Sequence, residues 1–168
     1  MYCIQTLNSI KAANALNKAL PSDRASPLKV LIQVNTSGED SKSGFSPLAP
    51  SSNLEESELI KLAKYVVTEC PKLRLEGLMT IGALELSLAA SDTENNADFD
   101  KLRETRDLLS THLHNSFSSD EKRWGDQKSG RLSLSMGMSS DFEAALKAGS
   151  DVVRVGSSIF GQRPQKST

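Results

Sequence analysis

The stretch LSLSMGMSSDFEAALKAGSDVVRVGSSIFG, residues 132–161, carries the pattern that decides the fold. Residues 132–136 alternate apolar and serine side chains, which is the period of a β-strand. Ser140 and Glu143 have the spacing of a helix-capping box, and Gly149 fits the position just after that helix. Residues 152–155 then predict a second strand. Because the connection between the two strands is short, we expect them to lie parallel and adjacent.

Each of these two strands ends in a loop of small residues, at 137–140 and at 156–158. Parallel strands end at the same edge of a sheet, so the two loops should lie side by side. Together they offer backbone N–H groups and hydroxyls, which can bind an anion without a lysine. Tight turns also select glycine and serine. Two adjacent loops with Arg154 between them nevertheless favour a phosphate site, like the one after the last two strands of a (β/α)₈ barrel.

The rest of the chain repeats the strand-then-helix pattern. Strands are predicted at 2–6, 30–34 and 75–81, and helices at 9–20, 53–70 and 98–114. Five strands that alternate with four helices indicate an α/β fold with a parallel sheet and a site at the carboxyl ends of its strands. A closed (β/α)₈ barrel usually needs roughly 200 residues or more, so part of such a barrel is expected. An open doubly wound sheet is the alternative, although no glycine-rich dinucleotide turn follows the first strand.

We expect residues 1–168 to form one domain, since a chain of this length can bury a core of its own. Polar composition predicts flexible loops over about 86–97 and 116–131. The tail over 162–168 is expected to be frayed.

Composition argues against several classes of partner and location. The chain has 20 basic and 21 acidic residues, a net charge of −1, which predicts no nucleic-acid or anionic membrane surface. No apolar run approaches the ~18 residues that cross a bilayer. Cys3 and Cys70 lie far apart and no Cys/His cluster suggests a metal site. Free thiols fit a reducing compartment, so the cytoplasm is expected, with the mitochondrion as the alternative.

Four motifs resemble the pyridoxal phosphate homeostasis proteins. They are IQVNTSGE with SKSG within 32–44, GLMTIG at 77–82, LSMGMSSDF at 134–142 and VRVGSSIFG at 153–161. They occur in the family's order and cover nearly the whole chain. The resemblance implies an alanine-racemase-like (β/α)₈ barrel that binds pyridoxal 5′-phosphate (PLP) and has no established enzymatic activity. This chain would be the C-terminal portion, about five parallel strands that correspond to strands four to eight of the barrel.

The same resemblance implies a cofactor-binding set at the ends of the last two strands. Its members are Ser135, Met136, Ser139, Arg154, Gly156 and Ser157. Arg154 would face the pyridine nitrogen, while the three serines and Gly156 would surround the phosphate. Because arginine is always charged and only donates, it keeps that nitrogen unprotonated and the ring a poor electron sink.

The family's first three strand–helix units, with the lysine that forms the Schiff base, have no counterpart here. Lys29 would lie at the start of a strand, and Lys42 on a loop with no sign of the desolvation that activates an amine. We therefore expect a non-catalytic protein of intracellular PLP homeostasis that binds PLP non-covalently. Self-association through the open edge of 2–6 is also expected.

Two alternative functions are also compatible with the sequence. One is a PLP-dependent amino-acid racemase. Racemisation on this fold takes one of its two acid/base groups from an additional β-domain, which makes that activity the less favoured one. The other is a phosphate-binding half-barrel that assembles with a partner.

Overall fold

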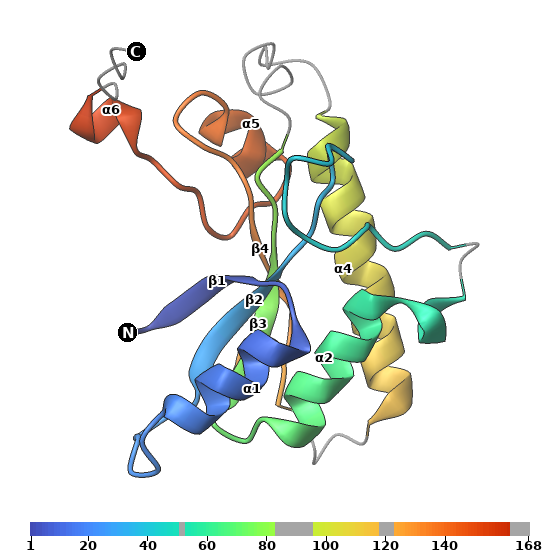
Figure 1. Ribbon diagram of the computed structural model, residues 1–168. Helices are drawn as coiled ribbons and strands as arrows, with labels where there is room; N and C mark the ends of the chain where they lie inside the picture. Colours follow the sequence, from blue (N-terminus) through green and yellow to red (C-terminus); the bar gives the residue numbers. More distant parts are fainter. Residues whose placement is uncertain (51–52, 83–95, 118–122, 162–168) are drawn as a thin grey trace.

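The computed structural model describes residues 1–50, 53–82, 96–117 and 123–161 (Figure 1). A parallel sheet of four strands in the order β1-β2-β3-β4 lies at its centre. The strands are β1 Cys3–Leu7, β2 Leu28–Gln33, β3 Leu73–Met79 and β4 Ser133–Ser135. Four of the five predicted strands thus form, and each pairs with the next one along the chain. The α/β class with a parallel sheet is confirmed.

The fifth predicted strand, residues 152–155, does not form. Only Val152 pairs with the sheet, through a single bridge to Ser135. In a regular parallel ladder the N–H of Arg154 would donate to the carbonyl of Met136. The Ser150 hydroxyl lies 2.8 Å from that carbonyl, and the Arg154 N–H donates instead to Gly137, at 3.1 Å. This one-residue shift ends the strand and turns the segment into a loop.

Three long helices lie on one side of the sheet (Figure 1). They are α1 Ile10–Ala19, α2 Glu58–Glu69 and α4 Ala97–Ser116. Three short ones complete the fold: η1 Leu54–Glu56, α5 Phe142–Lys147 and α6 Ser157–Phe160. The core joins strand residues such as Ile32 and Leu78 to helix residues such as Leu62 and Phe99. Among the described helices, none is long and apolar enough to cross a membrane.

Two helix ends follow from their local sequence. Ser9 caps α1, and its Oγ accepts the N–H of Ala12 at 3.2 Å. Gly149 follows α5 at a φ of +91°. Its N–H and that of the next residue donate to the carbonyls of Leu146 and Ala145, at 3.0 and 2.9 Å. This pair of bonds is a Schellman motif, which glycine permits because it tolerates positive φ.

The predicted capping box of Ser140 and Glu143 is wrong. Helix α5 begins at Phe142, so Asp141 and not Ser140 occupies the N-cap. The Asp141 carboxylate accepts the N–H of Met138 at 2.6 Å, before the helix starts. The aspartate therefore closes the loop after β4 into a tight turn, and the helix starts one residue later than the motif predicts.

The loop predicted over about 116–131 is solvated only in part. Residues 118–122 lie outside the described residues. Trp124 is 1% exposed and forms a bridge with Leu75. Its carbonyl accepts from the Arg74 guanidinium at 3.2 Å. Trp124 therefore belongs to the core, which the surrounding charged residues concealed.

Most of the other predicted loop, 86–97, and the whole tail, 162–168, also lie outside the described residues. The described end of that loop already belongs to α4. Asn96 caps this helix, and its side chain accepts the N–H of Asp98 at 2.9 Å.

Candidate functional site

The two Gly/Ser loops meet at the carboxyl end of β4, as predicted. The N–H of Gly156 donates to the Ser139 Oγ at 2.9 Å. Because the Ser139 hydroxyl accepts in this bond, its own proton remains available for another acceptor. The contact therefore joins the loops and leaves a donor at their junction.

A hollow of about 540 Å³ opens beside this contact. It is lined by Met138, Ser139, Ser140, Arg154, Val155, Gly156 and Ser157. The volume lies within the usual range for sites that bind small molecules. Hydroxyls and a guanidinium line the hollow, and none of these described residues carries a carboxylate. Such a lining suits an anionic ligand.

The Arg154 side chain is held at two points beside the hollow. Its Nη1 donates to the Oγ of Ser135 at 2.8 Å, and its Nη2 donates to the carbonyl of Thr80 at 2.7 Å. Burial lowers the pKa of this guanidinium, and the negative charge of Asp141 opposes the effect. An arginine still carries its charge at neutral pH. Arg154 is therefore a positive charge in a defined place.

The predicted set of six residues divides into two groups. The pocket brings together Ser139, Arg154, Gly156 and Ser157. Ser135 lies behind Arg154 and is 0% exposed, and its Oγ donates to the Oε1 of Gln5 at 2.7 Å. With its single proton used there, this hydroxyl cannot also donate to a phosphate. Met136 is fully buried in the core.

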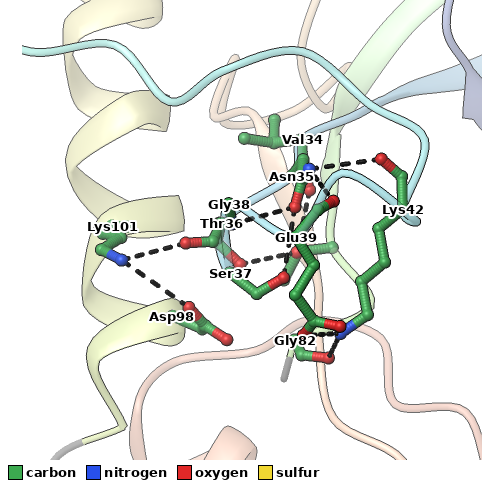
Figure 2. Close-up of polar contacts among 11 residues, drawn as sticks. Val34, Asn35, Thr36, Ser37, Gly38, Glu39, Lys42, Gly82, Asp98 and Lys101 are labelled. Carbon is green, nitrogen blue, oxygen red and sulfur yellow. Dashed lines mark hydrogen bonds and ion pairs between the residues drawn. The ribbon is translucent and has the colours of Figure 1, made fainter. Parts of the chain in front are cut away.

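A third loop, residues 35–44, follows β2 at the same edge of the sheet. Figure 2 shows Asn35 at its centre, where Nδ2 donates to the carbonyls of Glu39 and Lys42 at 2.9 and 3.2 Å. The Lys42 ammonium donates to the Glu39 carboxylate at 2.6 Å and to the carbonyl of Gly82 at 2.8 Å. These bonds tie the loop to the chain just after β3.

The same loop is tied to α4 and to the Arg154 anchor. Lys101 donates to the carbonyl of Thr36 at 3.0 Å and lies 3.9 Å from the Asp98 carboxylate (Figure 2). The hydroxyls of Thr36 and Thr80 are 2.8 Å apart and buried. The Thr80 carbonyl also accepts the hydrogen bond from Arg154. The loop after β2 therefore helps to hold the arginine in place.

Sequence reasoning missed two residues of this site, Gln5 and Thr80. The only sequence signal for Gln5 is that a polar side chain stands within a half-buried strand, and this pattern alone does not point to a site. Thr80 contributes its backbone carbonyl to Arg154, and any residue at that position would offer the same atom.

The described residues contain no group of three or more His, Cys, Asp and Glu side chains that could hold a metal ion. No lysine belongs to the described lining of the pocket either. The residues present thus fit an anion held by hydrogen bonds and one positive charge.

Residues 2–164 match the sequence model of the alanine racemase, N-terminal domain, family. A pyridoxal phosphate homeostasis protein from Caenorhabditis elegans is 38% identical over 169 residues, which cover 99% of this chain and 59% of that protein. One from Schizosaccharomyces pombe is 41% identical over 164 residues, 98% of this chain and 57% of that protein. The chain thus spans somewhat more than half the length of these relatives.

A similar solved structure is that of PipY from Synechococcus elongatus PCC7942, with PLP bound. It is 24% identical, with a TM-score of 0.61, and the match covers 95% of this chain and 60% of PipY. At this identity the likeness shows a shared fold.

Proposed function

The chain belongs to the alanine racemase N-terminal domain family, and on that premise we propose that it binds PLP in the pocket between its two Gly/Ser loops. The observation that carries the proposal is Arg154, a fixed positive charge beside the hydroxyls of Ser139 and Ser157. Two relatives are named pyridoxal phosphate homeostasis proteins, and PipY was solved with PLP bound. These names support the same ligand.

The residues of the pocket suggest how each end of PLP is held. The hydroxyls of Ser139 and Ser157, with the loop at Gly156, would bind the phosphate. Arg154 would face the pyridine nitrogen and donate to it. When bound, PLP supplies an electron-withdrawing ring, and a partner that only donates keeps its nitrogen unprotonated and that property weak. Ser135 would hold Arg154 and would not touch the phosphate.

We propose that PLP is held non-covalently and that the protein has no catalytic role of its own. No lysine belongs to the described lining of the pocket, and the Lys42 ammonium is bonded to Glu39 and Gly82. The role that fits is storage or delivery of PLP, in keeping with the names of the relatives. The free thiols Cys3 and Cys70 fit a reducing compartment such as the cytoplasm.

We propose further that the sheet is part of a (β/α)₈ barrel. Its parallel strands follow in sequential order, as in such a barrel. Among the described strands, β1 pairs only with β2, so the backbone groups on its other side can pair with a further strand. A second copy of the chain would supply one, which is the proposed route of self-association.

Pyridoxine 5′-phosphate tests the binding proposal, because it lacks the aldehyde and cannot react with surface lysines. In calorimetric titration we expect saturable binding to the unmodified protein. Arg154→Gln should weaken it about tenfold or more, since hydrogen bonds from charged groups are the strong ones. Arg103→Gln, an exposed arginine on α4, is the control and should change nothing. No binding, or equal binding by the Arg154→Gln protein, would refute the assignment.

Borohydride treatment of the PLP complex tests the non-covalent mode. We expect little PLP to be trapped on the protein. Stoichiometric labelling of one lysine would contradict this part of the proposal, and peptide mapping should then begin at Lys42.

A further inference from the structure

We propose that Gln5 is a positioning residue for this pocket, because it orients the hydroxyl of Ser135 and through it the guanidinium of Arg154. The inference deepens the proposed function and rests on it. Gln5 lies on β1, at the opposite edge of the four-stranded sheet from Ser135. Its side chain contacts a residue 130 positions away, so the edge strand reaches the site directly.

The direction of each hydrogen bond follows from the chemistry of the partners. The Oε1 of Gln5 can only accept, so Ser135 donates to it at 2.7 Å. The guanidinium can only donate, so Ser135 accepts from Arg154 at 2.8 Å. If the acceptor on Gln5 were lost, the buried Ser135 proton would have to find another partner. The other partner of this hydroxyl among the described residues is Arg154, which only donates and cannot accept that proton.

A second anchor turns this contact into a fixed orientation. The Nη2 of Arg154 donates to the carbonyl of Thr80, and the N–H of Thr80 donates to the carbonyl of Ser135 at 3.1 Å. The two acceptors of the guanidinium are therefore tied to each other. Within the described part of the chain, two of its five N–H groups have acceptors. The other three are left for a ligand.

A glutamine serves this arrangement better than a glutamate would. Both offer an oxygen to Ser135, but a carboxylate would also place a negative charge close to Arg154. That charge would offset the field that attracts a phosphate. Gln5 accepts the hydrogen bond and leaves the positive charge of the pocket intact.

Two substitutions separate the acceptor from the charge. Gln5→Met keeps the length of the side chain and removes the acceptor, while Gln5→Glu keeps the acceptor and adds a charge. Thr6→Val, an exposed neighbour on β1, is the matched control. The first readout is the ¹⁵N NMR signal of the two Nη groups of Arg154 in the ligand-free protein, assigned by its loss in Arg154→Lys. Separate signals mean that the guanidinium does not flip.

We expect separate Nη signals in the unmodified, Gln5→Glu and Thr6→Val proteins, and faster flipping, by about tenfold, in Gln5→Met. The second readout is affinity for pyridoxine 5′-phosphate. Gln5→Met should weaken it about three- to tenfold with an unchanged dependence on salt. Gln5→Glu should weaken it and make it less salt-dependent, because the net charge of the pocket falls.

Unchanged flipping in Gln5→Met overturns the proposal, and so does identical behaviour of the two variants in both readouts. If Gln5→Met does not fold, Gln5→Glu decides alone, since it must keep the separate signals and show binding that is less salt-dependent than that of the unmodified protein. If the unmodified protein does not bind pyridoxine 5′-phosphate, the proposed function fails. The Nη signals of the free protein then still decide whether Gln5 positions Arg154.

Discussion

Replacing Gly137 with alanine should destabilise the protein far more than the same replacement at Gly149. The two glycines have nearly the same φ, +92° and +91°. A Cβ at Gly149 would meet nothing within 4 Å, whereas at Gly137 it would lie 2.5 Å from the Cβ of Ala145. The difference between the two variants therefore isolates one steric contact between the loop after β4 and helix α5.

The magnitudes follow from these two environments. An L-residue at positive φ costs roughly 1–2 kcal/mol, so Gly149→Ala should lower the free energy of unfolding by about that much. Carbon atoms pack at about 3.5–4.0 Å, so Gly137→Ala must also push α5 away from the loop. Overpacking of this kind typically adds about 1–3 kcal/mol. Because a domain is stable by only about 5–15 kcal/mol, the difference is easy to measure.

Urea unfolding followed by the fluorescence of Trp124 measures it, since this single tryptophan is buried in the native state. Adding Ala145→Gly to Gly137→Ala removes the obstructing methyl group. The double variant should recover stability, although glycine within a helix costs about 1 kcal/mol. Equal midpoints for the two single variants would refute the reasoning, as would an Ala145→Gly change that only destabilises further.

Three further predictions use other contacts. Burial lowers the pKa of His112, so the unfolded chain binds more protons and stability should fall as the pH drops below about 6.5. Urea midpoints from pH 8 to 5 check this, and His112→Gln should flatten their slope. Lys29→Met should cost up to about 3 kcal/mol, because the Glu76 carboxylate, which is 8% exposed, loses its partner at 2.6 Å and keeps only the Arg74 guanidinium at 4.0 Å. Adding Glu76→Leu should restore most of that loss, and a single variant as stable as the unmodified protein would contradict the argument. If β1 pairs with a second copy, the melting temperature should rise with protein concentration, and a value constant over a hundredfold dilution would exclude self-association.

Patterns that depend on neighbouring residues predicted most of the fold. The four strands formed because their apolar residues must be buried on a sheet, and α1 began at the residue after Ser9. Gly149 ended α5 because only glycine takes that φ without cost. The long helix predicted from residue 53 is instead interrupted at Ser57, which has an extended conformation between η1 and α2.

Features that depend on distant contacts could not be predicted in this way. The fifth strand does not form because the Ser150 hydroxyl lies against the Met136 carbonyl. The S-x-x-E spacing at Ser140 likewise does not reveal that Asp141 occupies the N-cap of α5. For the site, the alternation of β4 places Ser135 and Met136 on opposite faces. It cannot tell that Arg154 covers the first of them.

The hydrogen bond between Gln5 and Ser135 has a consequence for how the protein is made. It joins residues 130 positions apart, and Arg154 follows later still. Strands β1, β2 and β3 pair in the order in which they leave the ribosome, so they can associate while the chain is still growing. The pocket cannot form until residues 154–157 have also emerged. A nascent chain that stalls before that point would carry the first strands of the sheet and no place for a phosphate.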